Sequence, residues 1–130
     1  MSLQSPPVLR ANRLDSRLDS SLDSRVELEL QLSPDRDRAD GPFEGHFPEH
    51  AVLPGLIQLH WVVELAQRHL QVGARFRDLV GVKFQKVIQP GQRLNLELEW
   101  NDALGELRFR YHASGDTYSS GKLRVADRAA

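Results

Sequence analysis

The chain contains no cysteine, and this absence removes several kinds of site at once. Without thiols it can have no disulfide framework, no thiol nucleophile and no cysteine-ligated metal. Long apolar runs are also missing, and none approaches the roughly 20 residues that a helix needs to cross a bilayer. Residues 1–16 lack the apolar core of a secretory signal. We therefore expect a cytoplasmic protein with no membrane partner.

An excess of positive charge is missing as well. Lys and Arg number 17 against 18 Asp and Glu, so the formal net charge is −1 and we expect no nucleic-acid partner. The rest of the composition is ordinary for a globular protein, with 40% hydrophobic and 27% charged residues in 130. This length predicts one domain. We place it at residues 25–130, after a flexible leader over residues 1–24.

The leader contains a near-repeat that begins at Leu14, Leu18 and Leu22. Leucines at this spacing could line one side of a helix, but the Asp and Ser between them favour caps and turns. We therefore expect a mobile, weakly helical arm. From Arg25 to Ser33 apolar and polar residues alternate, which predicts a half-buried strand. The charged, Gly- and Pro-containing residues 34–42 predict an exposed loop.

The stretch from Phe43 to Gln67 holds three of the five histidines and the only long helical pattern. Prolines disfavour helix at the residues before them, whereas Pro54 suits the first turn of a helix. The apolar residues that follow recur along two stripes, Leu56, Leu59, Val63, Ala66 and Leu70, and Ile57, Trp61 and Leu65. We expect a helix that is apolar around most of its girth, and therefore buried, and that ends near Gly73.

After the helix the apolar pattern changes to alternation. Strands are predicted over residues 79–88, 94–100, 107–113 and 118–125, with short turns between them, which is typical of an antiparallel meander. One apolar helix is the only cover available for the apolar face of this sheet. The sequence therefore predicts an α+β fold in which a curled antiparallel sheet wraps one long central helix. Pairing through an edge strand favours a dimer.

Two short motifs in the central stretch carry a resemblance to a known family. The turn Gly45-His46-Phe47-Pro48 is followed by the helix opening Leu53-Pro54-Gly55, and residues 82–91 add a strand and a Pro-Gly turn. This arrangement resembles the hot-dog-fold β-hydroxyacyl-[acyl-carrier-protein] dehydratases of the FabA/FabZ type. The sequence Gln58-Leu-His-Trp61 is similar to the ApeI-like branch, which is associated with aryl polyenes. The resemblance implies a cofactor-free homodimer that dehydrates a 3-hydroxyacyl thioester held on the phosphopantetheine of an acyl carrier protein.

The resemblance also implies roles for individual residues. His46 is the expected base, and the backbone N–H of Gly55 is expected to bind the thioester carbonyl at the start of the helix. Fourteen positions after His46 the relatives carry Glu or Asp, whereas this chain has His60. A charged imidazole could donate the proton instead, and Glu64, one helical turn further on, could keep it protonated. Three further residues are expected to line the substrate site or the core: Phe47, Pro54 and Trp61.

Other interpretations of these residues stay open. His46 and His60 could be solvated or hydrogen-bonded structural histidines, and His69 and His112 belong to no motif. His50 lies four residues after His46, but Pro48 breaks the helix that a metal pair at this spacing requires, so we expect no metal. A thioesterase on the same fold would use a helix carboxylate such as Glu64, and a non-catalytic relative would bind the acyl carrier without turnover.

Carrier proteins are acidic, so a surface that docks one should be basic. Five basic residues follow the helix and are the candidates for this surface: Arg75, Arg77, Lys83, Lys86 and Arg93. The alternative is an ordinary solvated face.

Overall fold

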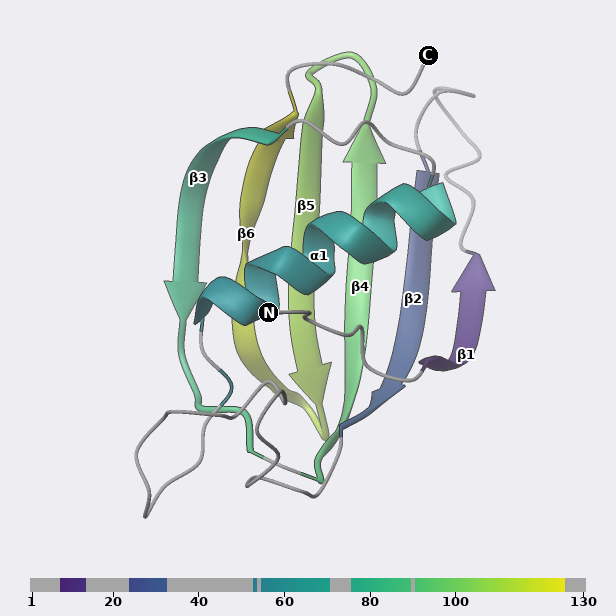
Figure 1. The fold of residues 1–130 in the computed structure, drawn as a ribbon, viewed down its shortest axis with the longest axis vertical. Coiled ribbons are helices and arrows are strands. Elements are labelled where there is room, and N and C mark those ends of the chain that lie inside the picture. The colour runs from purple at the N-terminus through teal and green to yellow at the C-terminus, as the bar shows by residue number, and fades with distance from the viewer. Residues whose placement is uncertain are drawn as a thin grey trace, which may run out of the picture.

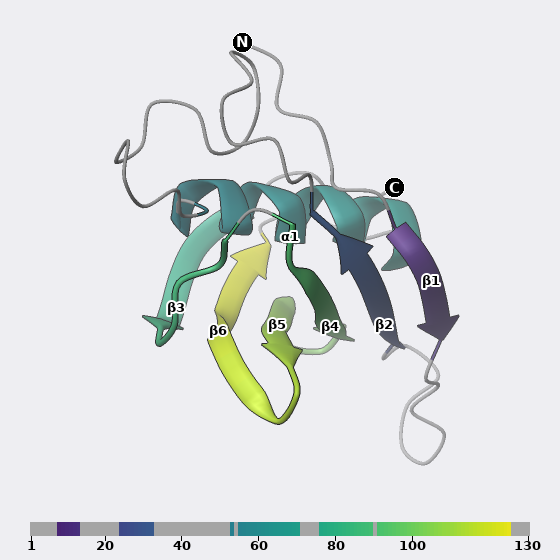
Figure 2. The same cartoon turned by 90° about the horizontal axis from the view of Figure 1, so that it is seen from below.

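The computed structural model describes residues 8–13, 24–32, 53, 55–70, 76–89 and 91–125 (Figure 1). They form one helix, α1 (Gly55–Leu70), and the strands β1 (Val8–Arg13), β2 (Ser24–Gln31), β3 (Phe76–Phe84), β4 (Arg93–Asn101), β5 (Glu106–Ala113) and β6 (Asp116–Val125). The described strands make one antiparallel sheet in the order β1-β2-β4-β5-β6-β3. Figure 2 shows this sheet curling around α1, which lies across its concave side, as the sequence predicts.

Alternation of side chains builds the core between sheet and helix. In β2 and β4 every second residue is buried, and the register places Leu28 opposite Leu96 on the concave face. β5 continues this apolar surface with Leu107, Phe109 and Tyr111, all at most 1% exposed. Each apolar side chain removed from water in this way contributes about 1.5–3 kcal/mol relative to an exposed one. The strands predicted over residues 94–100, 107–113 and 118–125 are confirmed.

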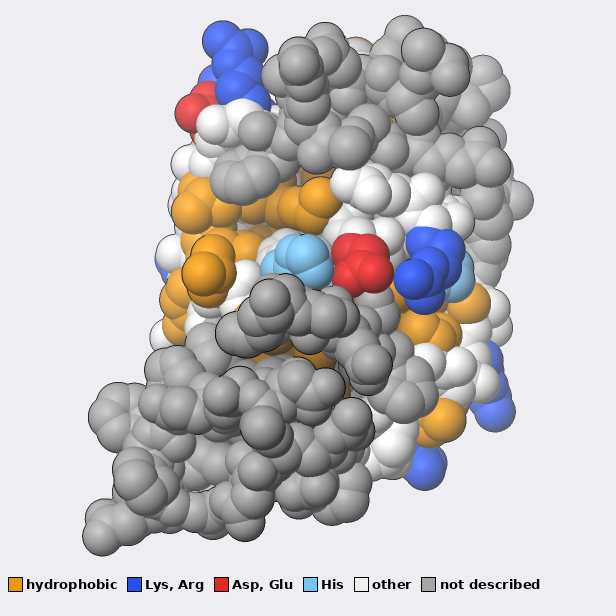
Figure 3. Space-filling model, in the orientation of Figure 1, with side chains coloured by type: hydrophobic (Ala, Val, Ile, Leu, Met, Phe, Trp, Pro, Cys, Tyr) orange, Lys and Arg blue, Asp and Glu red, His pale blue; other side chains and the backbone are white. Residues whose placement is uncertain are grey.

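The helix is confirmed, but the prediction that it is apolar and buried around most of its girth is wrong. The sheet covers only one side of α1, which buries Trp61, Val62, Leu65, Ala66 and Leu70. The other side faces outward, and Leu56 is 78% exposed there. Figure 3 shows the outcome as a row of histidine, acidic and basic side chains along the helix, beside a hydrophobic group near β3. In the described part of the chain, this helix is too short and too polar to span a membrane.

Two boundary predictions were wrong. The leader was expected to be weakly helical, yet Val8–Arg13 forms β1 at the edge of the sheet, where backbone pairing with β2 outweighs a weak local preference. The strand expected over residues 79–88 begins at Phe76 and ends at Phe84. It stops because the N–H groups of Gln85 and Lys86 both donate to the carbonyl oxygen of Tyr118, at 2.8 and 3.0 Å, so the chain leaves the ladder.

Candidate functional site

The start of α1 is held by contacts on several sides. Leu53 donates its N–H to the carbonyl oxygen of Ile88 (2.7 Å), and its own carbonyl accepts a bond from Gln58 Nε2 (3.1 Å). Gly55 opens the helix under the ring of Phe84, and a Cβ there would lie only 2.8 Å from Phe84 Cζ. The first N–H groups of a helix have no partner within it and favour negative charge. The helix start can therefore receive a polarised carbonyl oxygen.

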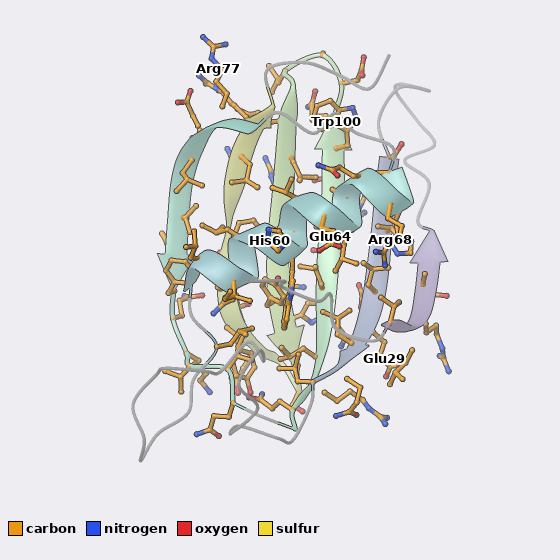
Figure 4. The ribbon with its side chains drawn as sticks, viewed as in Figure 1. Glu29, His60, Glu64, Arg68, Arg77 and Trp100 are labelled. Carbon is orange, nitrogen blue, oxygen red and sulfur yellow. The ribbon has the colours of Figure 1, made fainter. Side chains whose placement is uncertain are left out.

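One turn further along, three side chains form a line on the outward face of α1 (Figure 4). His60 Nε2 lies 3.5 Å from Glu64 Oε1, and Glu64 Oε2 lies 3.5 Å from an Arg68 guanidinium nitrogen. The His60 side chain is 45% exposed. Glu64 Oε1 is buried and accepts no hydrogen bond within the described residues. The helix thus brings together the two residues that the sequence analysis paired, with the carboxylate behind an accessible imidazole.

The remaining predicted site residues divide into two groups. His46, Phe47 and Pro54 lie outside the described residues, as does Arg75. Trp61 is described and is 1% exposed, packed in the core between helix and sheet. The structure therefore assigns Trp61 to the core in this chain, which was one of its two expected places.

The two histidines without a motif lie away from this line. His112, on β5, has its Nε2 3.6 Å from Glu27 Oε2 on β2, on the face of the sheet that points away from the helix. His69 lies near the end of α1, where burial first and the neighbouring Arg68 second lower its pKa.

The described candidates for carrier docking do not form one surface. Arg77 lies near the start of β3 (Figure 4), whereas Lys83 and Lys86 lie near its end. From Arg77 to Phe84, the last residue of β3, the strand runs about 23 Å at 3.3 Å per residue. Lys83 points to the convex side of the sheet, where it lines a hollow. Lys86 Nζ lies over the ring of Tyr118 and donates a hydrogen bond to Asp116 Oδ2 at 2.8 Å, and this bond raises the pKa of Lys86. Arg93 contacts Gln31 on β2 instead.

The hollow beside Lys83 has a volume of about 430 Å³ and lies on the far side of the sheet from α1. Its charged lining comes from alternate strand residues that point away from the core: Lys83, Glu97, Glu99, Arg108, Arg110 and Lys122. Glu97 and Arg110 approach within 3.5 Å, and Glu99 and Arg108 within 3.9 Å. An acyl chain needs an apolar channel, so this charged hollow does not fit the acyl group that the sequence resemblance implies.

This curled sheet with one central helix is matched among known proteins. The family model described as "ApeI-like: ApeI dehydratase" matches residues 19–122, which is most of the chain. The chain belongs to the ApeI-like dehydratase family. This result confirms the resemblance stated from the sequence, including the narrower branch.

Solved structures agree with this membership in the ApeI-like family. A protein from Erwinia carotovora subsp. atroseptica is 32% identical, with a TM-score of 0.77, and the match covers 95% of this chain and 98% of that one. The dehydratase heterocomplex ApeI:P from Xenorhabdus doucetiae contains a chain that is 31% identical, with a TM-score of 0.75 and coverage of 94% and 98%. These neighbours confirm the hot-dog fold.

Dehydratases of the FabZ type match a smaller part of the ApeI-like chain at a similar identity. The 3-hydroxyacyl-[acyl-carrier-protein] dehydratase FabZ of Geobacillus thermodenitrificans is 35% identical over 72 residues, which are 50% of this chain and 50% of that protein. FabZ of Thermus thermophilus is 30% identical over 92 residues, 62% of this chain and 65% of that protein. The chain spans about half to two thirds of the length of these relatives.

The sequence did not predict two strand residues that contact the helix start. Ser119 and Tyr111 both bond to Gln58, yet they lie more than fifty positions further along the chain. The one available signal was Gln58 itself. A glutamine among the apolar residues of a core helix needs polar partners.

Proposed function

We propose that this protein dehydrates a 3-hydroxyacyl thioester, carried on an acyl carrier protein, to the trans-2-enoyl thioester, in polyene or fatty-acid synthesis. The observation that carries the proposal is the line on α1: an accessible His60 stands one helical turn beyond Gly55 and contacts Glu64 at 3.5 Å. FabZ relatives and membership in the ApeI-like family support the reaction class.

The reaction needs a base, an acid and a carbonyl donor. A ring nitrogen of His46 takes the proton from C2 as the C2–C3 double bond forms. The C3–O bond breaks, and the departing hydroxyl takes a proton from His60 and leaves as water. The thioester carbonyl accepts a hydrogen bond from the N–H of Gly55 while negative charge develops on its oxygen. Glu64 and Arg68 stay behind His60, where the carboxylate stabilises the imidazolium.

The proposal is tested by giving the purified protein a 3-hydroxyacyl carrier-protein thioester and following the mass of the acyl group. Loss of one water with the thioester intact supports the dehydratase. Release of free acid would favour a thioesterase, for which the buried Oε1 of Glu64 would be the group that activates water. Binding of the acyl carrier without any mass change would favour the non-catalytic alternative.

Replacement of Glu64 by glutamine tests the pairing on the helix. The variant keeps the shape of the side chain but removes the charge next to His60, so the imidazolium is less stabilised. We expect kcat to fall about tenfold while KM changes little. Arg68→Gln, which changes a charge one turn further away, is the control and should lower kcat less. An unchanged kcat in Glu64→Gln would rule out the pairing as part of the chemistry.

The carrier-docking role is proposed for Lys86, which follows the end of β3 that lies beside the helix start, because Lys83 points to the opposite face of the sheet. Reversing this charge (Lys86→Glu) should raise KM for the carrier-bound substrate about fivefold, mainly through slower association, while KM for a short thioester without the carrier stays the same. Arg77→Glu, at the other end of β3, is the matched control. Equal effects of the two changes, or an effect on both substrates, would contradict docking at this end.

The proposal includes a second subunit, because the family resemblance implies that the base and the acid come from different subunits. β3 is an edge strand of the described sheet, and two of its own hydrophobic side chains are exposed, Leu79 (49%) and Phe84 (53%). An open edge of this kind can pair with another chain. Mass measurement in solution tests the homodimer. A monomer that becomes active only with a second, different hot-dog chain would replace it by a heterocomplex, the kind of assembly that ApeI:P from Xenorhabdus doucetiae forms.

A further inference from the structure

Gln58 and Ser119 are the polar residues that are buried in the described core, at 3% and 0% exposure. They bond to each other: Ser119 Oγ donates to Gln58 Oε1 at 2.6 Å. The Tyr111 hydroxyl donates to the backbone carbonyl of Gln58 at 2.7 Å, and Gln58 Nε2 donates to the carbonyl of Leu53 at 3.1 Å. A leucine at position 58 would fill a similar space and need no hydrogen-bond partners. Burying the glutamine amide costs free energy, and packing alone does not explain why the core contains it.

The partners of Gln58 come from one row across the sheet. Tyr111 on β5 lies directly opposite Ser119 on β6, and Ser119 lies opposite Phe84 on β3. The first two bond to Gln58, and the Phe84 ring covers Gly55. Three residues that are paired across β5, β6 and β3 thus contact Gly55 and Gln58 at the start of the helix. Burial raises the pKa of Tyr111 well above its ordinary value, so its hydroxyl remains a donor.

We infer that Gln58 is a positioning residue, which fixes the helix start and the Gly55 amide relative to the sheet through Ser119 and Tyr111. The inference rests on the proposed function, in which Gly55 binds the thioester carbonyl. A donor contributes to catalysis when it is already aimed at the oxygen before the charge develops. A helix start that shifts by a fraction of an ångström still admits substrate but stabilises the transition state less. The cluster therefore acts on kcat more than on KM.

The test uses two conservative deletions of a hydroxyl, Ser119→Ala and Tyr111→Phe, in the full chain. Each is expected to lower kcat about tenfold or more while KM stays within about twofold, since small displacements of catalytic groups cost large factors in rate. The Gly55 amide resonance is expected to shift in both variants.

Two control variants separate positioning from plain loss of stability. Ser120→Ala removes the neighbouring hydroxyl of β6, which lines the hollow on the opposite face, and should leave kcat and the Gly55 resonance unchanged. Leu107→Val lowers the melting temperature by thinning the core further along β5 and should leave kcat unchanged.

The positioning role is overturned if both hydroxyl deletions leave kcat within twofold, or if Leu107→Val reduces it as much for the same loss of melting temperature. Failure of the proposed function looks different, because the unaltered protein would then dehydrate no 3-hydroxyacyl thioester. In that case the Gly55 resonance decides. A shift in Ser119→Ala but not in Ser120→Ala supports positioning of the helix start, and no shift overturns it.

Discussion

Replacing His60 by alanine is expected to lower kcat for 3-hydroxyacyl dehydration by about 10²- to 10⁴-fold, the usual contribution of a positioned acid. The departing hydroxyl would then have no donor on the helix, because the Glu64 carboxylate behind His60 is an acceptor when ionised. KM should change little, since Gly55 and Lys86, the proposed carbonyl donor and docking residue, stay unchanged. Steady-state kinetics with one carrier-bound substrate measure both constants.

His60→Glu is the informative companion to this variant. It installs the carboxyl group that the family resemblance implies at this position, and a protonated carboxyl group can donate to the departing hydroxyl. We expect it to recover at least about a tenth of the lost rate at slightly acidic pH. If His60→Ala keeps full activity, the acid lies elsewhere and His60 is an ordinary exposed histidine of the helix.

Replacing Trp61 by alanine is expected to destabilise the fold by about 3–5 kcal/mol. The side chain is 1% exposed and belongs to the core that α1 shares with the sheet, so its removal leaves a large cavity. Domains of this size have only about 5–15 kcal/mol of stability, so the variant should unfold far more readily in urea and lose much of its yield. Equilibrium unfolding, followed by circular dichroism, measures the change.

Arg68→Ala is the matched control for Trp61→Ala, because it lies on the same helix with its side chain 55% exposed. Its ion pair with Glu64 is partly solvated, and we expect a loss of at most about 0.5 kcal/mol. If Trp61→Ala folds normally but binds the acyl chain poorly, Trp61 lines the substrate channel, and its place in the core would need revision.

Much of the fold could be predicted from the alternation of side chains. β2, β4 and β5 each place one face against the core, and their buried apolar residues alternate with more exposed residues along the sequence. β1 could not be found in this way, since its residues 9–12 are exposed and its structure depends on pairing with β2. The end of β3 was misplaced for a similar reason. Ile88 is buried outside any strand, so its apolar character extended the predicted strand too far.

The candidate site was predictable where its geometry is local. A spacing of four residues on a helix is enough to place Glu64 beside His60. The contacts of Gln58 are not local, because they depend on how β5 and β6 align under the helix start, and no neighbouring residue specifies that alignment. The exposed outer face of α1 was also hidden from the sequence, because exposure depends on which side the sheet covers.

The one-sided cover of α1 has a consequence for how such an enzyme can change over evolution. The core residues Trp61, Val62 and Leu65 face the sheet, while His60 and Glu64 face outward. An exchange at position 60 therefore disturbs no residue of the described core, and under the proposed role of His60 a different proton donor can replace it at little cost to folding. Because the core residues and position 60 lie on different sides of α1, a histidine can replace a carboxyl group there without compensating changes in the core.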